Sequence, residues 1–231
     1  MELEEVISKL KIKLQKFPVN WDGKESILSM KKEGYSHWKQ NEWIGFYFQF
    51  LCDKYLKDIP GIKIPGTRYG RAEFDGKLLI DWDFKAHPIL NKNDKPSNEL
   101  IANDMDATAL SLQENGKIGL IVACGQATFD DEKMSFRAWH KELKGGDSAY
   151  SLDNIRRNAK KRVYKTSFLV KSINIYILDQ KDVNNQGRFQ KGMRNSNGKP
   201  RREKLSIDLT KITPKETIQF HSWKTFLMLL L

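Results

Sequence analysis

The sequence predicts an α/β fold, with a mixed central β-sheet flanked by helices in a single domain. Apolar residues recur at helical spacing over residues 3–17 and are dense over residues 39–58, which indicates an amphipathic helix and then a buried helix. A hairpin signal and a second helical stretch follow, and then a continuous apolar run at residues 118–124 that is typical of a strand covered on both faces. This order of elements predicts a mixed sheet, and 231 residues can bury a sizeable core.

The first half of the chain can be divided further by its proline and cap signals. The N-terminal helix should end before Pro18, and a short helix is expected at residues 26–32. Pro60 and Pro65 separate the buried helix from the hairpin. Residues 88–98 are polar and are interpreted as a loop, in which Ser97 can cap a helix that runs to about residue 114.

The second half contains fewer regular elements and more polar sequence. A helix is expected over residues 130–143, and the two glycines at 145–146 should end it. Residues 173–178 and 205–209 predict strands on either side of a long polar stretch. The apolar segment at residues 226–231 is interpreted as a terminal helix or strand that packs into the core.

The hairpin carries an unusual set of charged residues. The Asp-Gly pair at positions 75–76 is a turn signal, so residues 71–74 and 77–87 are expected to form the two arms. On the second arm Asp81, Asp83 and Lys85 alternate and should leave the same face of the strand. Two like charges two residues apart repel each other, and a bound cation would resolve that repulsion. The alternative is that this is the solvated face of an ordinary antiparallel strand.

Composition indicates the class of partner. Forty Lys and Arg against 29 Asp and Glu give a net charge of +11 and a pI near 9.5. This balance attracts polyanions, so nucleic acid is the leading partner. A membrane is not expected, because the apolar runs at residues 118–124 and 226–231 are far shorter than the about 20 residues needed to span a bilayer.

The cellular setting can be predicted from the N-terminus and the cysteines. The N-terminus has no secretory signal character, which predicts a cytoplasmic protein. Cys52 and Cys124 both lie in apolar segments and are expected to be buried free thiols rather than a disulfide or a zinc site. The sequence contains no glycine-rich phosphate-binding loop, so no nucleotide cofactor is expected.

The element order together with Asp83-Phe84-Lys85 resembles the PD-(D/E)xK nuclease superfamily, and the chain looks most like a type II restriction endonuclease. The resemblance covers residues 39–126, the expected restriction-endonuclease-like core, while residues 150–231 would form a C-terminal DNA-recognition elaboration. It implies that Asp83 binds a metal ion and that Lys85 is the lysine of the motif. Glu42, at the start of the buried helix, matches an acid that such enzymes often contribute from this position.

The first acid of the family motif has no clear counterpart. The family has an Asp, usually after Pro, on the first hairpin arm, but residues 65–71 contain no acid. Glu73 and Asp75 are the nearest substitutes. A turn centred on residues 75–76 would place Arg68 opposite Asp83 and leave Glu73 about 15 Å away, unless a bulge or a longer loop changed the register. Asp81, about 7 Å along the strand from Asp83, could supply the second carboxylate instead.

The resemblance therefore implies metal-assisted cleavage of double-stranded DNA at a short, palindromic site by a homodimer. The cofactor would be Mg²⁺, for which Mn²⁺ should substitute. The candidate catalytic residues are Asp83, Lys85, Asp81 and Glu42, and the candidate metal ligands are Asp83, Asp81, Glu42, Glu73 and Asp75. Two alternatives are a structure-specific or repair nuclease and a DNA-binding module without catalysis.

The polar stretch contains the residue types that contact DNA. Arg can contact guanine, Asn and Gln can contact adenine, and Lys and Arg can neutralise phosphates. The candidate DNA-binding residues are Arg188, Gln190, Lys191, Arg194, Asn195, Asn197, Lys199, Arg201 and Arg202. The alternative is a solvated, mobile connection. The basic residues within 154–165 could likewise follow a phosphate backbone or form a solvated helix face.

Overall fold

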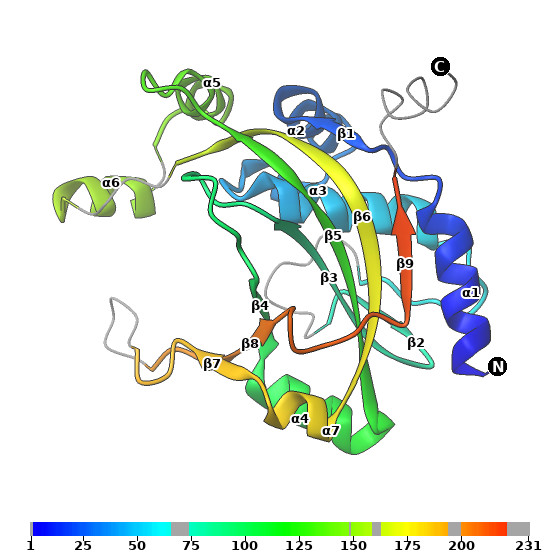
Figure 1. Cartoon of the computed structure of the whole chain (residues 1–231). Helices are drawn as coiled ribbons and strands as arrows, with labels where there is room; N and C mark the ends of the chain where they lie inside the picture. The colour runs from blue at the N-terminus through cyan, green and yellow to red at the C-terminus, as the bar shows by residue number, and fades with distance from the viewer. Residues whose placement is uncertain (1, 66–73, 148, 159–162, 194–199, 221–231) are drawn as a thin grey trace.

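A computed structural model describes residues 2–65, 74–147, 149–158, 163–193 and 200–220. Its centre is a curled, six-stranded mixed sheet (Figure 1). The strands lie in the order β1 (Asn20–Asp22), β6 (Lys165–Asp179), β5 (Lys117–Phe129), β3 (Ile80–Pro88) and β2 (Gly76–Leu78), and β9 (Glu216–Gln219) also pairs with β6. The pair β3 and β5 is parallel and the other pairs are antiparallel. The predicted α/β class with a mixed sheet is confirmed.

A second, smaller sheet lies against one end of the first. It contains β4 (Glu99–Asp104), β8 (Lys204–Asp208) and β7 (Gly187–Phe189), all antiparallel. Because β4 and the helix α4 (Met105–Asn115) stand between β3 and β5, they form the crossover that makes these two strands parallel.

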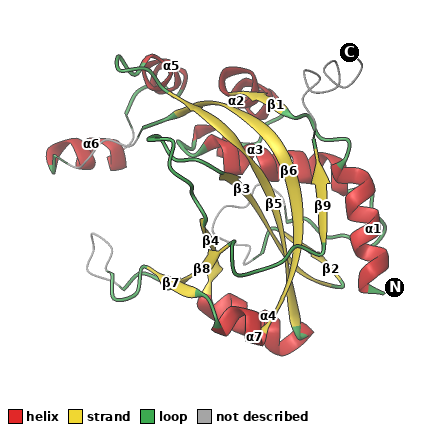
Figure 2. Ribbon diagram, viewed as in Figure 1, coloured by secondary structure: helices red, strands yellow, loops and turns green. Residues whose placement is uncertain are grey.

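Helices cover the central sheet on both sides (Figure 2). One apolar cluster joins one face of the sheet to α1 (Leu3–Leu14), α2 (Gly23–Lys32) and α3 (Trp43–Leu56). A second cluster joins the opposite face to the smaller sheet and α4, close to the short helix α7 (Gln180–Asn184). Ile121 and Val122 belong to different clusters and are both fully buried, so β5 is covered on both faces, as predicted.

Two predicted helices begin later than expected. Residues 99–104 form the strand β4, and Asp104 rather than Ser97 caps the following helix by accepting a hydrogen bond from Ala107 N at 2.9 Å. The helix expected over 130–143 is α5 (Ser135–Leu143). It begins after Asp130 because the side chain of Asp130 accepts hydrogen bonds from the backbone N atoms of Phe136 and Arg137, in the first turn of the helix.

The remaining segments were predicted in part. The helix expected over 39–58 is α3, which begins four residues later than predicted and follows a 3₁₀ turn at Ser36–Lys39. Another helix, α6 (Ala149–Arg156), follows α5. The segment 226–231 lies outside the described residues. None of the helices described here is long and apolar enough to cross a membrane.

The predicted position of the hairpin turn was wrong. The chain reverses at Leu79, which has a φ of 63°, and Gly76 pairs with Trp82. Gly76 serves close packing instead of a turn, since a Cβ there would lie 2.9 Å from Phe84 Cζ. Lys77 exchanges two 2.8 Å backbone hydrogen bonds with Lys63, which extends the pairing on the outer side of β2.

Candidate active site

The register of the hairpin brings two acids together. With Gly76 opposite Trp82, the next residue outward on the first arm is Asp75, and its backbone N donates to Trp82 O at 3.0 Å. Asp75 therefore lies beside Asp83, its neighbour across the hairpin. Arg68, which the predicted turn placed opposite Asp83, lies outside the described residues. Of the two substitutes considered for the first acid, Asp75 is the one that the described hairpin places beside Asp83.

Lys85 links the two acids. Its Nζ forms an ion pair with Asp83 Oδ1 and lies 3.7 Å from Asp75 Oδ2. The side chain of Asp83 is only 7% exposed, whereas those of Lys85 and Asp75 are 24% and 25% exposed. The cluster therefore has one deeply buried carboxylate and an outer side that solvent or a ligand can reach.

Asp75 is held in a fixed orientation by two hydrogen bonds. Its Oδ2 accepts from the backbone N of Phe84 at 2.8 Å, and its Oδ1 accepts from Nε2 of Gln49 at 2.9 Å. Gln49 comes from α3, and sequence analysis did not single it out. A signal was present, because Gln49 is the one amide in the otherwise apolar and aromatic residues 43–52.

The charges of the cluster perturb one another. Burial raises the pKa of Asp83 to about 7; the Asp75 carboxylate acts in the same direction, and Lys85 opposes both. Burial also disfavours the Lys85 ammonium, but the adjacent carboxylates of Asp83 and Asp75 outweigh it and raise the pKa of Lys85. The lysine therefore remains charged at neutral pH, while Asp83 keeps its proton to a higher pH than an exposed aspartate does.

The cluster fits a hard divalent cation. Asp83 Oδ2 is buried and has no hydrogen-bond partner within the described part of the chain, and Lys85 provides one positive charge for the two carboxylates of Asp75 and Asp83. Magnesium is commonly held by one or two carboxylates together with water and substrate phosphate. No group of three or more His, Cys, Asp or Glu side chains suited to a metal occurs among the described residues. The two carboxylates of Asp75 and Asp83 match the number that a protein commonly contributes to such a site.

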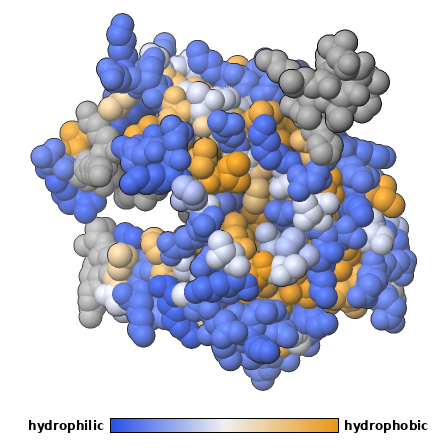
Figure 3. Space-filling model, viewed as in Figure 1, coloured by the Kyte–Doolittle hydropathy of each residue, from blue (hydrophilic) through white to orange (hydrophobic). Residues whose placement is uncertain are grey.

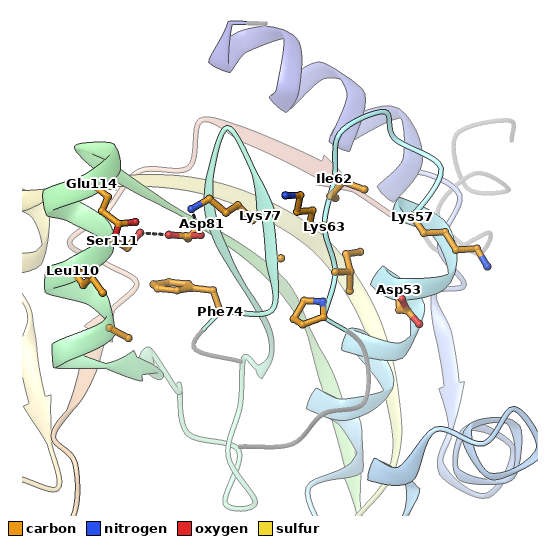
Figure 4. Close-up of a pocket in the computed structure, with 14 residues that line it drawn as sticks. Asp53, Lys57, Ile62, Lys63, Phe74, Lys77, Asp81, Leu110, Ser111 and Glu114 are labelled. Carbon is orange, nitrogen blue, oxygen red and sulfur yellow. Dashed lines mark hydrogen bonds and ion pairs between the residues drawn. The ribbon is translucent and has the colours of Figure 1, made fainter. Parts of the chain in front are cut away.

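Asp81 is directed to α4 instead of to Lys85. Its Oδ2 accepts hydrogen bonds from Ser111 Oγ at 2.7 Å and Asn115 Nδ2 at 3.0 Å, and its Oδ1 lies 3.5 Å from Lys77 Nζ. Figure 4 shows this hydrogen bond between Asp81 and Ser111, which both line a pocket of about 830 Å³ beside the hairpin. Although Asp81 leaves the strand on the same side as Asp83, its partners give it a structural role.

Glu42 is also separate from the two-acid cluster. It precedes α3, and its Oε2 lies 2.7 Å from Lys165 Nζ. Seven residues of helix, about 10 Å, separate it from Gln49. Glu42 instead lines a cavity of about 660 Å³ with His87 at the far end of β3. Glu73, the other candidate ligand, lies outside the described residues.

The candidate DNA-binding residues lie on an arm formed by β7, β8 and the segment between them. Arg201 N donates to Met193 O at 2.8 Å, which continues the pairing beyond the strands. The described candidates are Arg188, Gln190, Lys191, Arg201 and Arg202. All are exposed except Gln190, which is partly buried. Arg194, Asn195, Asn197 and Lys199 lie outside the described residues.

A second basic element faces the arm across an opening. The helix α6 ends at Arg156, and Arg156 and the next residue, Arg157, both pair with Asp153. The basic residues 160–162 lie outside the described part. Figure 3 shows a notch in the molecular surface between α6 and the β7–β8 arm. The exposed arginine and lysine residues of the arm and the arginines at the end of α6 thus belong to the two elements on either side of this notch.

Comparison with known proteins gives no independent assignment. No protein-family model, curated protein or solved structure matches this chain.

Proposed function

We propose that the chain is a Mg²⁺-dependent endonuclease of the PD-(D/E)xK type that hydrolyses phosphodiester bonds of double-stranded DNA. The observation that carries the proposal is the convergence of Asp75 and Asp83 on Lys85. Asp75 supplies the first acid of the motif, which was the missing part of the resemblance. The α3 helix, the hairpin, α4 and β5 then correspond to a restriction-endonuclease-like core.

The residues of the cluster would have different roles in the reaction. Asp75 and Asp83 would hold Mg²⁺, or Mn²⁺ in its place, and this cation would supply positive charge to the phosphate and favour ionisation of the attacking water. Lys85 remains protonated and can stabilise negative charge that develops on the phosphate oxygens. Gln49 keeps the Asp75 carboxylate in place while the substrate binds.

The basic surfaces support DNA as the substrate. The net charge of +11 attracts a polyanion, and the exposed side chains of Arg188, Lys191, Arg201 and Arg202 can contact phosphates or base edges. We propose further that the enzyme is of restriction type and acts as a homodimer, so that two active sites cut both strands of a palindrome. Sedimentation equilibrium with and without a DNA duplex measures the number of copies bound.

The proposal is tested by incubating supercoiled plasmid with the wild-type protein and two lysine variants in Mg²⁺. Lys85→Ala should still bind DNA while cleavage falls by at least about 1,000-fold, because the variant removes a preorganised charge. Lys77→Ala, on the same hairpin and outside the cluster, should cut within a few-fold of wild type. Cleavage by Lys85→Ala at the wild-type rate, or no cleavage by wild type in either Mg²⁺ or Mn²⁺, would refute the proposal.

The same digests distinguish a restriction enzyme from a nuclease that recognises DNA shape. Discrete fragments with ends at one short sequence are expected for the restriction type. Cutting that is confined to branched, nicked or flapped DNA would assign the same active site to a structure-specific or repair nuclease.

A further inference from the structure

We propose that one buried water molecule bridges Asp83 to Asn103 and Thr108 and holds the Asp83 carboxylate in place from the protein interior. The water site goes beyond the proposed function and does not depend on it. Its effect on the binding of a metal ion by Asp83 rests on the proposed function, and there Asn103 and Thr108 act as positioning residues.

A small cavity adjoins Asp83 between the central sheet and the smaller sheet. It is lined by Asp83 of β3, by residues of β4, β5, β6 and β8, and by Thr108 of α4. Leu120, Leu205 and Ile207 in its wall are at most 2% exposed, so the cavity lies in the core. Its volume is about 10 Å³, which is room for one water molecule and too little for a base or a phosphate.

Two polar atoms of the residues that line this cavity have no hydrogen-bond partner among the described residues. They are Asp83 Oδ2 and Asn103 Nδ2, and both are buried. The third polar side chain of the lining is Thr108, which is 1% exposed and donates from its Oγ1 to Asp104 O at 2.8 Å. Its oxygen can still accept a hydrogen bond. Buried polar atoms are nearly always paired, and ordered water supplies the partner where the protein does not.

The orientation of the Asn103 amide is fixed by its other atom. Asn103 Oδ1 accepts a hydrogen bond from the backbone N of Asp104 at 2.9 Å, so the remaining amide atom is the donor Nδ2. The pairing of β4 with β8 shifts register between Ile101 and Asp104, and such irregularities change the direction of side chains in a strand. The occupant of the cavity therefore has to accept a hydrogen bond from an amide and donate one to a carboxylate.

Water meets both requirements, whereas a metal ion cannot accept a hydrogen bond from Asn103. A water molecule here can donate to Asp83 Oδ2 and Thr108 Oγ1 and accept from Asn103 Nδ2. Three hydrogen bonds of this kind are typical of a buried water. An oxygen of a carboxylate has two lone pairs, so the water and the proposed Mg²⁺ can share Asp83. Carboxylates that bind a metal are usually held by outer partners of this type.

The water site is tested by a high-resolution crystal structure of the wild-type protein grown in EDTA and then soaked in Mn²⁺. Electron density for one water should lie within about 3.2 Å of Asp83 Oδ2 and Asn103 Nδ2. The anomalous signal of Mn²⁺ should appear between Asp75 and Asp83 and be absent from the cavity. A direct hydrogen bond from Asn103 to Asp83, a cation in the cavity, or no density in it would overturn the inference. A cavity water without an anomalous peak at the two acids would instead refute the proposed function and leave the water site standing.

The positioning role is tested by measuring the Kd for Mg²⁺ by calorimetry and DNA binding in EDTA. Thr108→Val keeps the shape of the side chain and removes one partner of the water, and Asn103→Leu removes another. Either variant should raise the Kd for Mg²⁺ by at least about 10-fold and leave DNA binding unchanged, because the outer support of Asp83 is lost.

Two control variants separate the loss of the water from the loss of a hydroxyl. Thr108→Ser keeps a hydroxyl at the cavity and should bind Mg²⁺ like wild type. Thr166→Val should do the same, because Thr166 also donates to a backbone carbonyl, Thr128 O at 3.3 Å, but lies outside the cavity. A wild-type Kd for Mg²⁺ in both Thr108→Val and Asn103→Leu, or an equal loss of Mg²⁺ binding in Thr166→Val, would overturn the positioning role.

Discussion

Raising the pH from 5 to 8 in the absence of divalent cations should destabilise the wild-type protein more than the Asp83→Asn variant. The native pKa of Asp83 is about 7, whereas its ordinary value is 3.8. Between these values the native state retains a proton that the unfolded chain has released. The resulting stabilisation is complete below pH 3.8 and is lost as the pH rises to 7.

The magnitude follows from the width of that window. Each pKa unit corresponds to about 1.4 kcal/mol, and the interval from pH 5 to the native pKa spans two units, so the free energy of unfolding should fall by about 2–3 kcal/mol. Asp83→Asn has no proton to lose at this position. Its free energy of unfolding should therefore lack this component, while all other titrations remain common to both proteins.

The assay is urea unfolding of both proteins at pH 5, 6, 7 and 8 in EDTA, followed by tryptophan fluorescence. Addition of Mg²⁺ at pH 8 should then raise the wild-type unfolding midpoint and leave that of Asp83→Asn nearly unchanged, because a ligand stabilises only the state that binds it. Parallel pH profiles for the two proteins would show that Asp83 does not titrate as the two-acid cluster requires.

Three other predictions concern the surroundings of the cluster. Gln49→Ala should raise the Mg²⁺ concentration for half-maximal cleavage by at least about 10-fold, because Asp75 loses its orientation; an unchanged Mg²⁺ dependence in a folded variant would exclude this positioning role. Asp81→Asn and Glu42→Gln should keep the wild-type Mg²⁺ dependence in the same titration, and a rise of 10-fold or more in either would return that acid to the metal site. Leu79→Gly should raise the free energy of unfolding by about 0.5–1 kcal/mol in urea, since a left-handed leucine is strained, and a decrease would mean that packing by Leu79 outweighs the strain.

The parts of the site that the sequence could predict are those that depend on strand periodicity alone. Asp83 and Lys85 are two residues apart, so any extended conformation puts them on one face, and the structure pairs them. The buried strand at residues 118–124 was likewise predictable, because an apolar run of this length requires cover on both faces. Neither prediction needed knowledge of distant contacts.

The position of Asp75 depends on contacts that local patterns do not contain. An Asp-Gly pair normally indicates a turn, but here the absence of a side chain on Gly76 allows Phe84 to pack closely. The reversal occurs instead at Leu79, whose left-handed backbone is unfavourable for a leucine. Tertiary packing thus gives the hairpin a different register from the one that the Asp-Gly signal predicts, and in this register Asp75 lies beside Asp83. The contact from Gln49 was equally hidden, because it joins a helix to a hairpin 26 residues away.

The contrast between Asp81 and Asp83 supports a role for Asp83 in binding. The two acids leave the same side of β3, but the fold provides Asp81 with hydrogen bonds from Ser111 and Asn115. Asp83 is the more deeply buried, yet its Oδ2 receives no hydrogen bond from any described residue. A buried, unpaired carboxylate oxygen is costly, and a purely structural acid at this position would be expected to acquire a donor as Asp81 did. An arrangement that gives donors to one acid and none to Oδ2 of the other, beside Asp75 and Lys85, is the one that the proposed metal-binding role of Asp83 predicts.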